Sequence, residues 1–387
     1  MKKHVLIAWV LAVQAVMASG IGFSWDVVPK FLYISGTEQF DSKDLDYIAE
    51  NFCWVTFAIG FGKNDHETYD EAFKHAALEL KQRNPRIKVL YYWNAARCFS
   101  TYGRASETFM QHPGWDLSRG ALGFNEDGRP IRLQNGVTTP EINIADSGAR
   151  RWWLDHACKA LALPCADGIW IDATARIYLP AARRKLEQAG LFAASEEALH
   201  AMYGELAECC RGRGKILMGN FLREQDGIPD EKLWAHFDGS FVENHYNLLE
   251  DGTPLEEYEA KIETIIKKTR TAAKNGKMIG FYAGGAFDPA YDPGQFSFEE
   301  RKRKLREHFE YNLALYLILA EEGVYFEYND GFRSNTHVWN AEYPEYARRL
   351  GKPAGPASKQ GHVYQREFAH ASVSLDIEKR SAAIIWR

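Results

Sequence analysis

A short segment that recurs along the chain limits the fold more than any other feature. Residues 167–172 (Asp-Gly-Ile-Trp-Ile-Asp) and 238–243 (Asp-Gly-Ser-Phe-Val-Glu) share a glycine, an aromatic residue two positions later and an acid two positions after that, and 323–327 (Gly-Val-Tyr-Phe-Glu) is a weaker third copy. On a β-strand these positions lie on one face, because side chains alternate with a period of two. Buried carboxylates are costly unless they are paired or used. The repeat therefore predicts three strands that end in acids at a shared polar site.

The rest of the sequence alternates short apolar runs with helical stretches. Eight such runs begin near residues 31, 53, 87, 168, 215, 239, 277 and 323. They are almost continuously apolar, which is typical of parallel strands buried on both faces. Eight strands separated by helices predict a (β/α)8 TIM barrel. A doubly wound open sheet is the alternative, but Gly60-Phe61-Gly62 is too short for a phosphate-binding glycine turn.

The barrel is expected to span residues 19–355, with a long loop between its third and fourth strands at about 95–147. This loop is rich in Gly, Asn, Pro and Arg, and connections of such length are usually lids or binding loops. Residues 356–387 contain a few more apolar runs. They predict a short C-terminal β appendage that packs on the barrel.

The first 18 residues predict a secretory signal peptide. Lys2 and Lys3 precede an apolar stretch over 5–16, and Val16-Met17-Ala18 is a plausible cleavage site. That stretch is shorter than the roughly 20 residues of a membrane span. We expect a mature protein without a membrane span that is exported to the periplasm or the cell exterior. An uncleaved anchor is the alternative.

Composition and cysteine spacing narrow the possible partners. The formal net charge of −5 and the lack of a basic stripe argue against a nucleic-acid partner. No Cys/His spacing is typical of a zinc site, so no metal or other cofactor is predicted. Export permits disulfides among the six cysteines. Cys158 and Cys165 are a candidate pair, and the sequence does not predict an oligomeric state.

Two acids at the expected barrel rim suit glycosidic bond cleavage. Active sites of TIM barrels lie at the carboxyl ends of the strands, and side chains from alternate strands share a layer. Asp172, Glu243 and Glu327 end strands four, six and eight of the predicted order. One carboxylate can attack the sugar while the other, kept protonated, donates to the leaving oxygen. Salt bridges, such as one from Asp172 to Arg176, are the structural alternative.

Other residues near the expected strand ends are candidates for sugar contacts. Polar members would bind hydroxyl groups, and aromatic members would stack on or orient the rings. The predicted substrate-binding set is Glu38, Tyr33, Tyr92, Trp93, Asn94, Asn220, Tyr246, Tyr282 and Glu327. Core packing is the alternative for the aromatic residues, and structural pairing is the alternative for Glu327.

The segment Gly-Ile-Trp-Ile-Asp at 168–172 resembles the nucleophile strand of the superfamily that holds the α-galactosidase clan and glycoside hydrolase families 31 and 66. From about residue 31 onward the chain resembles hypothetical glycosyl hydrolase family 15, which belongs with that group. Tyr-Trp-Asn at 92–94, Arg-Trp-Trp at 151–153 and Arg-Glu-Phe at 366–368 carry this resemblance.

The resemblance implies that Asp172 is the nucleophile and that Glu243 stands at the acid/base position after strand six. The α-galactosidase clan has Asp at that position and a Lys before the nucleophile, where this chain has Trp170. The Glu is nearer the dextranase-like pattern of family 66.

These inferences predict an exported, retaining glycoside hydrolase with a carbohydrate substrate, either a polysaccharide or an oligosaccharide. One alternative is a non-catalytic glycan-binding barrel, which would need the aromatic residues but not the acids. Another is a polysaccharide lyase, for which Arg97, Arg176 and Arg223 are available as cations around a uronate.

Overall fold

The structure is a computed structural model that describes residues 22–58, 60–96, 121–122, 141–142, 144–223, 227–243, 253–284 and 296–387. The predicted signal peptide, most of the predicted 95–147 loop and Tyr246 lie outside the described residues. Within the described part, none of the helices has the length and apolar character that crossing a membrane requires.

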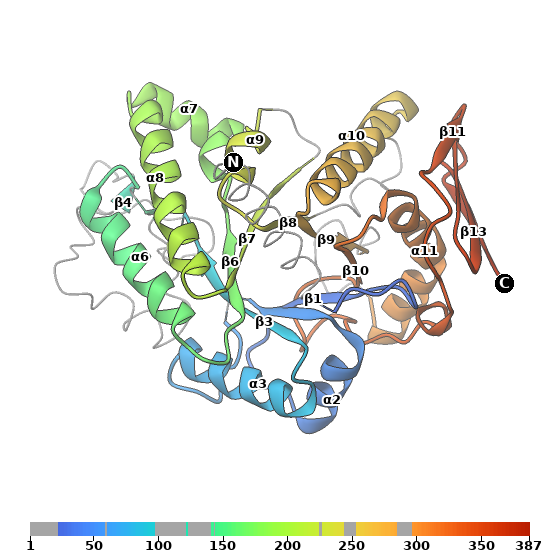
Figure 1. The fold of residues 1–387 in the computed structure, drawn as a ribbon, viewed down its shortest axis with the longest axis horizontal. Helices are drawn as coiled ribbons and strands as arrows, with labels where there is room; N and C mark the ends of the chain where they lie inside the picture. Colours follow the sequence, from blue (N-terminus) through green and yellow to red (C-terminus); the bar gives the residue numbers. More distant parts are fainter. Residues whose placement is uncertain are drawn as a thin grey trace, which may run out of the picture.

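Eight parallel strands form one sheet that curves into a barrel (Figure 1). In spatial order they are β1 (Phe31–Ile34), β2 (Trp54–Phe57), β3 (Lys88–Asn94), β6 (Gly168–Asp172), β7 (Ile216–Leu222), β8 (Gly239–Val242), β9 (Met278–Ala283) and β10 (Val324–Tyr328). Every neighbouring pair in this order is parallel. The structure thus confirms the predicted TIM barrel.

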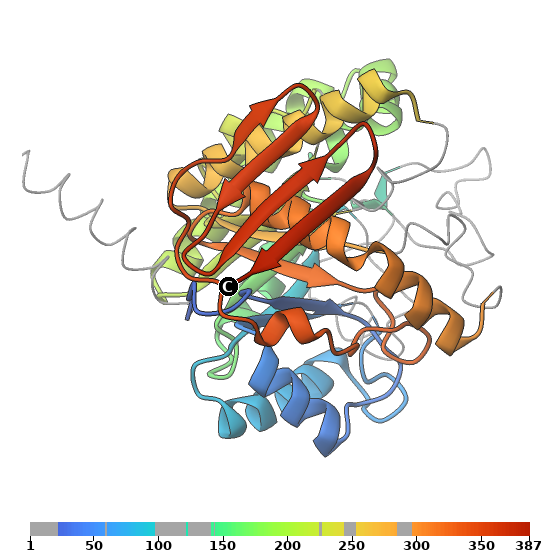
Figure 2. The ribbon, with the colours of Figure 1, turned by 90° about the vertical axis from the view of Figure 1, so that its right-hand side faces the viewer.

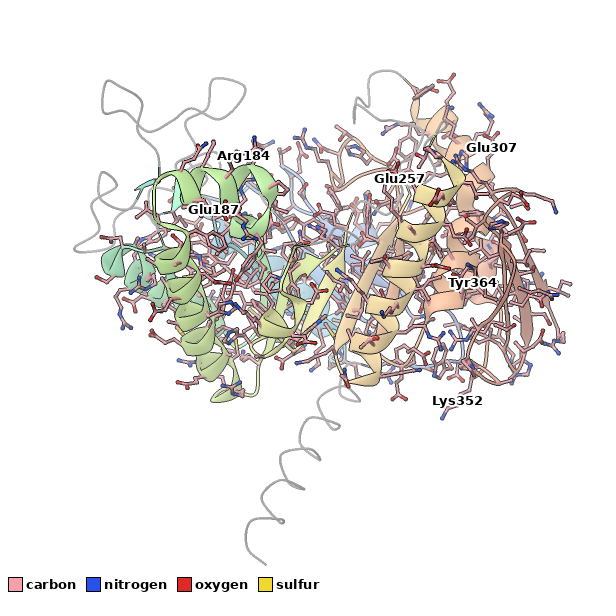
Figure 3. All side chains as sticks on the ribbon, turned by 90° about the horizontal axis from the view of Figure 1, so that it is seen from above. Arg184, Glu187, Glu257, Glu307, Lys352 and Tyr364 are labelled. Atoms are coloured by element: carbon pink, nitrogen blue, oxygen red, sulfur yellow. A yellow bond between two sulfur atoms is a disulfide. The ribbon has the colours of Figure 1, made fainter. Side chains whose placement is uncertain are left out.

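Helices connect the strands and form the outer ring. They are α2 (Ser42–Asn51), α3 (Tyr69–Arg83), α6 (Ser147–Leu161), α7 (Pro180–Gln188), α8 (Phe192–Arg211), α9 (Asp230–Trp234), α10 (Leu255–Lys274) and α11 (Phe298–Leu319). Short elements are β4 (Ala121–Leu122), β5 (Glu141–Ile142), η1 (Arg176–Tyr178) and η3 (Pro344–Ala347). Capping boxes at Thr68 and Ser297 begin α3 and α11. Figure 3 shows Arg184 and Glu187 of α7 and Glu257 of α10 on the outside of this ring.

The spacing of the repeated segment matches the layers of the barrel interior. A Cβ on Gly168 would lie 2.2 Å from Ile216 O, and one on Gly239 would lie 2.2 Å from Met218 Sδ, so neighbouring strands leave room only for glycine there. Two residues later, the rings of Trp170 and Phe241 meet with centroids 5.7 Å apart. Glycine, aromatic residue and acid therefore occupy successive layers from the amino to the carboxyl end of the strand.

The aspartate that opens each of the two strong copies joins adjacent strands. Asp167 Oδ2 accepts a hydrogen bond of 2.9 Å from the N–H of Val89 on β3. Asp238 Oδ2 accepts one of the same length from the N–H of Leu217 on β7. These side chains take main-chain donors at the amino ends of the strands, far from the acids that end each copy.

Barrel closure between β10 and β1 uses a side chain. Isolated parallel bridges join Lys30 to Phe326 and Ser35 to Arg333. Between them, Glu327 Oε2 accepts a 2.9 Å hydrogen bond from Tyr33 N–H, and Oε1 accepts one of 2.9 Å from Asn329 Nδ2. The Glu327 carboxyl therefore stands in for a main-chain acceptor at the seam.

A four-stranded antiparallel sheet follows the barrel and covers α11 (Figure 2). Its strands are β11 (Ser358–Gln360), β12 (Val363–Glu367), β13 (Ala371–Asp376) and β14 (Ser381–Trp386). Buried Arg366 of β12 donates to the carbonyl oxygens of Leu317 and Ala320 at the carboxyl end of α11, where a cation is favoured. This sheet is the predicted C-terminal appendage, with β11 as an additional strand.

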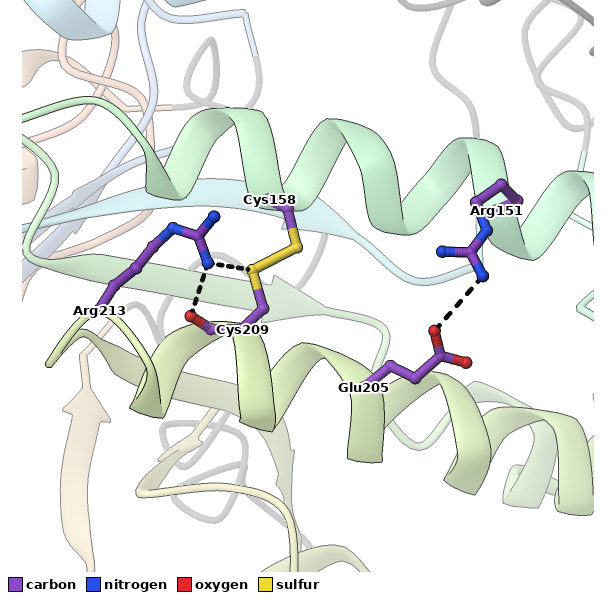
Figure 4. Close-up of a disulfide and its surroundings, with 5 residues drawn as sticks. All are labelled: Arg151, Cys158, Glu205, Cys209 and Arg213. Atoms are coloured by element: carbon purple, nitrogen blue, oxygen red, sulfur yellow. Dashed lines mark hydrogen bonds and ion pairs between the residues drawn. A yellow bond between two sulfur atoms is a disulfide. The ribbon is translucent and has the colours of Figure 1, made fainter.

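The disulfide joins Cys158 of α6 to Cys209 of α8, so the candidate pair Cys158–Cys165 does not form (Figure 4). The two helices lie side by side, which brings the Cα atoms of Cys158 and Cys209 to 6.5 Å despite 51 residues of separation. Arg151 of α6 and Glu205 of α8 form a second, exposed link at 3.8 Å. Cys165 is buried as a free thiol just before β6.

The seam carboxyl makes the stability depend on pH. Burial raises the pKa of Glu327 well above its ordinary range. A group with a higher pKa in the folded state stabilises the fold most below its unfolded-state pKa, about 4.3 for Glu, and this contribution is lost as the pH rises through the folded-state pKa. In the wild type, the free energy of unfolding should therefore fall as the pH rises from about 4.3 towards the folded-state pKa of Glu327. We expect this fall to be smaller in Glu327→Gln, as measured by urea unfolding across a pH series. Exposed Glu322→Gln is the matched control, and identical pH slopes for Glu327→Gln and wild type would contradict the assignment.

Candidate active site

One side-chain amide holds the two predicted catalytic acids together. Asn220 Nδ2 donates to Asp172 Oδ1 at 3.1 Å and to Glu243 Oε2 at 2.9 Å. Because both oxygens lie this close to one nitrogen, they are at most about 6 Å apart, a gap on the scale of glycosidase carboxylate pairs. The acids that end β6 and follow β8 therefore lie close together at the carboxyl ends of these strands.

Asp172 is surrounded by hydrogen-bond donors. Tyr92 Oη donates to Oδ2 at 2.8 Å, and Asn94 Nδ2 donates to the same oxygen at 3.1 Å. The Ala173 N–H donates to Oδ1 at 2.7 Å, beside the Asn220 amide. Asn94 and Asp172 are register partners in the β3–β6 pair, which explains their approach. Since an ionised carboxylate is an acceptor only, these four donors suit Asp172 in its anionic form.

A local irregularity in the sheet positions Asn220. The β7–β8 register shifts between Gly219 and Leu222. Ser240 Oγ fills the gap: it accepts from Leu222 N–H at 3.0 Å and donates to Gly219 O at 2.9 Å. The Asn220 N–H donates to Thr174 Oγ1 at 2.9 Å instead of to a strand partner. This bulge directs the amide between the two carboxylates.

Glu243 differs from Asp172 in its surroundings. Its Oε2 accepts from Asn220 and from Arg223 Nη2, the latter at 2.7 Å. Burial raises the pKa of Glu243, and the negative charge of Asp172 adds to this, while Arg223 opposes it. Of the two acids, Glu243 is thus the one whose environment favours the protonated form.

The structure brings Tyr92, Asn94 and Asn220 of the predicted substrate-binding set to the acid pair. Tyr33 and Tyr282 lie one layer deeper, where both are buried in the aromatic interior. The Tyr33 ring packs on Trp170 at 4.6 Å, and Tyr282 packs 6.1 Å from Phe241.

Three other predicted residues lie away from the acid pair. Trp93 is on the outer face of β3 and packs against Trp152 of α6 at 5.8 Å, as the period-two alternation from Tyr92 and Asn94 requires. Glu38 is exposed and accepts a hydrogen bond from Asn64 at 3.2 Å. Glu327 belongs to the barrel seam.

Arg223 is a site residue that the substrate-binding prediction missed. It directly follows β7, only three residues after Asn220. Extending the strand-end criterion from acids to basic residues would have found it. Thr174 and Ser240, which position Asn220, carry no comparable signal, because their roles depend on neighbours far away in the sequence.

The part of the chain that the structure describes contains no group of three or more His, Cys, Asp or Glu residues arranged to hold a metal ion. A cavity of about 750 Å³ lies at the opposite end of the barrel, beside Lys30 and Cys53 at the amino ends of β1 and β2. It is therefore separate from the acid pair.

Comparison with known proteins identifies a family for this chain. The sequence matches the family described as hypothetical glycosyl hydrolase family 15 over residues 81–372, which confirms the resemblance inferred from the sequence. No curated protein matches the sequence.

Similar solved structures include the maltogenic α-amylase AmyB of Thermotoga neapolitana, with 12% identity, 90% of this chain and 86% of that chain covered, and a TM-score of 0.50. The α-amylase of Geobacillus thermoleovorans has 11% identity with the same coverage and TM-score. The glycoside hydrolase domain of PelA from Pseudomonas aeruginosa has 13% identity, 77% and 93% coverage, and a TM-score of 0.47. At such identities the likeness shows the fold alone.

The opposing charges around Glu243 predict opposite effects of two substitutions on its pKa. Asp172→Asn removes the neighbouring negative charge and should lower the pKa of Glu243, whereas Arg223→Gln removes the positive charge and should raise it. Carbon-detected NMR titration of the Glu243 carboxyl, assigned with Glu243→Gln, measures both shifts. Shifts of the same sign in the two variants would contradict the site geometry.

Proposed function

Because the chain belongs to hypothetical glycosyl hydrolase family 15, we propose that it is a glycoside hydrolase that cleaves a polysaccharide or oligosaccharide with retention of anomeric configuration. The observation that carries this proposal is the Asn220 amide shared by Asp172 and Glu243. It limits their nearest oxygens to about 6 Å, below the roughly 6.5–9.5 Å of inverting pairs and close to the 5–5.5 Å of retaining ones.

The contrast between the surroundings of the two acids supports a different role for each. Asp172, with four donors on its oxygens, is the nucleophile that attacks the anomeric carbon and forms a glycosyl–enzyme ester. Glu243, whose pKa is raised, protonates the departing glycosidic oxygen. In the second step Glu243 takes a proton from water, which then attacks the ester and releases Asp172.

Tyr92, Asn94 and Asn220 then act through their contacts with the nucleophile. Their hydrogen bonds fix the orientation of Asp172 before the sugar arrives.

Substitution of either acid tests the reaction on any glycan that a screen shows to be cleaved. We expect Glu243→Gln to lower kcat about 10²–10⁴-fold, and Asp172→Asn to lower it at least as much because the nucleophile is gone. Exposed Glu187→Gln on α7 is the matched control and should retain wild-type kcat. Proton NMR of the first product should show the anomer of the substrate.

Three experimental outcomes would contradict this proposal. Near-wild-type kcat in either acid variant removes the assigned roles. An unsaturated product that absorbs in the ultraviolet identifies a lyase. Glycan binding that survives loss of both carboxylates, with no turnover by the wild type, identifies a binding protein.

We also propose that residues 1–18 direct export. The disulfide between Cys158 and Cys209 supports this, since such bonds persist in oxidising compartments. Protein recovered from the periplasm or medium should begin at Ser19 and carry the disulfide, as mass spectrometry with thiol labelling can show. Recovery only from the cytosol, with Met1 retained and both thiols reduced, would contradict export.

A further inference from the structure

Arg223 is the cation that contacts the acid pair Asp172 and Glu243. Its Nη2 contacts Glu243 Oε2 at 2.7 Å, and the side chains of Arg223 and Glu243 are only 18% and 21% exposed. A guanidinium remains charged at any physiological pH. The pair is therefore a largely buried ion pair, in which the charge of each partner depends on the other for compensation.

The guanidinium retains binding capacity after this contact. Its Nη1 is buried and has no hydrogen-bond partner among the described residues. Because the guanidinium is rigid and planar, Nη1 lies beside Nη2 and hence close to the Glu243 carboxylate. A buried donor left without a partner is costly, which favours a ligand group that completes it.

Contacts with α10 and, through Lys268, with α9 hold the main chain of Arg223 in place. Lys268 Nζ of α10 donates to the Arg223 carbonyl oxygen at 2.8 Å. The same Nζ forms an ion pair with Asp230 Oδ2 of α9 at 3.0 Å. The main chain of Arg223 is thus anchored to two helices, although it stands at the end of β7.

The proposed reaction changes the charge balance around Arg223. When Glu243 carries the proton that it donates, Arg223 loses its anionic partner. The other acid, Asp172, is separated from Glu243 by the Asn220 amide and is already held by four donors. A buried guanidinium would then lack a paired anion at the moment of catalysis, which is unfavourable unless the substrate supplies one.

We propose that Arg223 determines specificity by binding an anionic substituent, a carboxylate or a sulfate ester, on the sugar held at the acid pair. The substrate class is therefore an acidic polysaccharide or oligosaccharide. This inference rests on the proposed function. The substrate anion takes over the guanidinium through charge-assisted hydrogen bonds and leaves Glu243 free to hold its proton.

Inorganic sulfate tests the anion site without knowledge of the sugar. In Glu243→Gln the side chain keeps its shape but no longer compensates Arg223. We expect calorimetry at constant ionic strength to show sulfate binding at least about 10-fold tighter to Glu243→Gln than to wild type. The added Arg223→Gln substitution should abolish this gain. Equal sulfate affinity in wild type, the single variant and the double variant would overturn the proposal.

The substrate itself provides the second test. For a glycan that the wild type hydrolyses, carboxyl reduction or desulfation should lower kcat/KM roughly 100-fold. The treatment that has this effect identifies the anionic substituent as a carboxylate or a sulfate ester. Arg223→Gln should lower kcat/KM by a similar factor on the native glycan. On the neutralised glycan the same substitution should change kcat/KM little further, as expected for directly interacting partners. A neutral glycan as the best substrate, or unchanged kcat/KM after neutralisation, would overturn the proposal. If no glycan is hydrolysed, the proposed function fails while the sulfate titration still decides whether Arg223 binds an anion.

Discussion

The site depends on one shared donor, the Asn220 amide that bridges Asp172 and Glu243. Two ionised carboxylates at most about 6 Å apart repel each other by at least roughly 3 kcal/mol at an effective dielectric constant near 20. A common donor reduces this cost while holding both groups at the spacing of one sugar ring. Because β7 lies between β6 and β8 in the barrel, a residue near its carboxyl end can make both contacts.

The same repulsion favours a division of labour between the acids. Asp172 receives four donors from β3, its own following residue and β7, whereas Glu243 receives the amide and a single cation. Of the two acids, Glu243 is therefore the one whose pKa is raised, chiefly by burial. Arg223 opposes that outcome in the free protein, so the charge of the incoming ligand becomes part of the balance at the site.

The position of each strand in the barrel explains why the three copies of the repeated segment have different roles. In β6 and β8 the initial glycine lets adjacent strands approach, and the final acid contacts the Asn220 amide. In the third copy Gly323 instead occupies a turn with φ of +88°. Its acid, Glu327, supplies an acceptor where β10 meets β1. Of the three repeated acids, Glu327 therefore has a structural role at the seam, and the other two form the candidate site.

The sequence alone determined the eight strands, their order and the acids at or directly after the ends of β6 and β8, because strand periodicity and helix alternation are local patterns. Trp93 could also have been assigned to the outer face from its alternation with Tyr92 and Asn94. Only the tertiary structure decided the seam role of Glu327, the Cys158–Cys209 pairing, the bulge that directs Asn220 and the contact of Arg223 with Glu243. Each of these joins different secondary-structure elements, so its partner is set by how strands and helices pack and not by spacing along the chain.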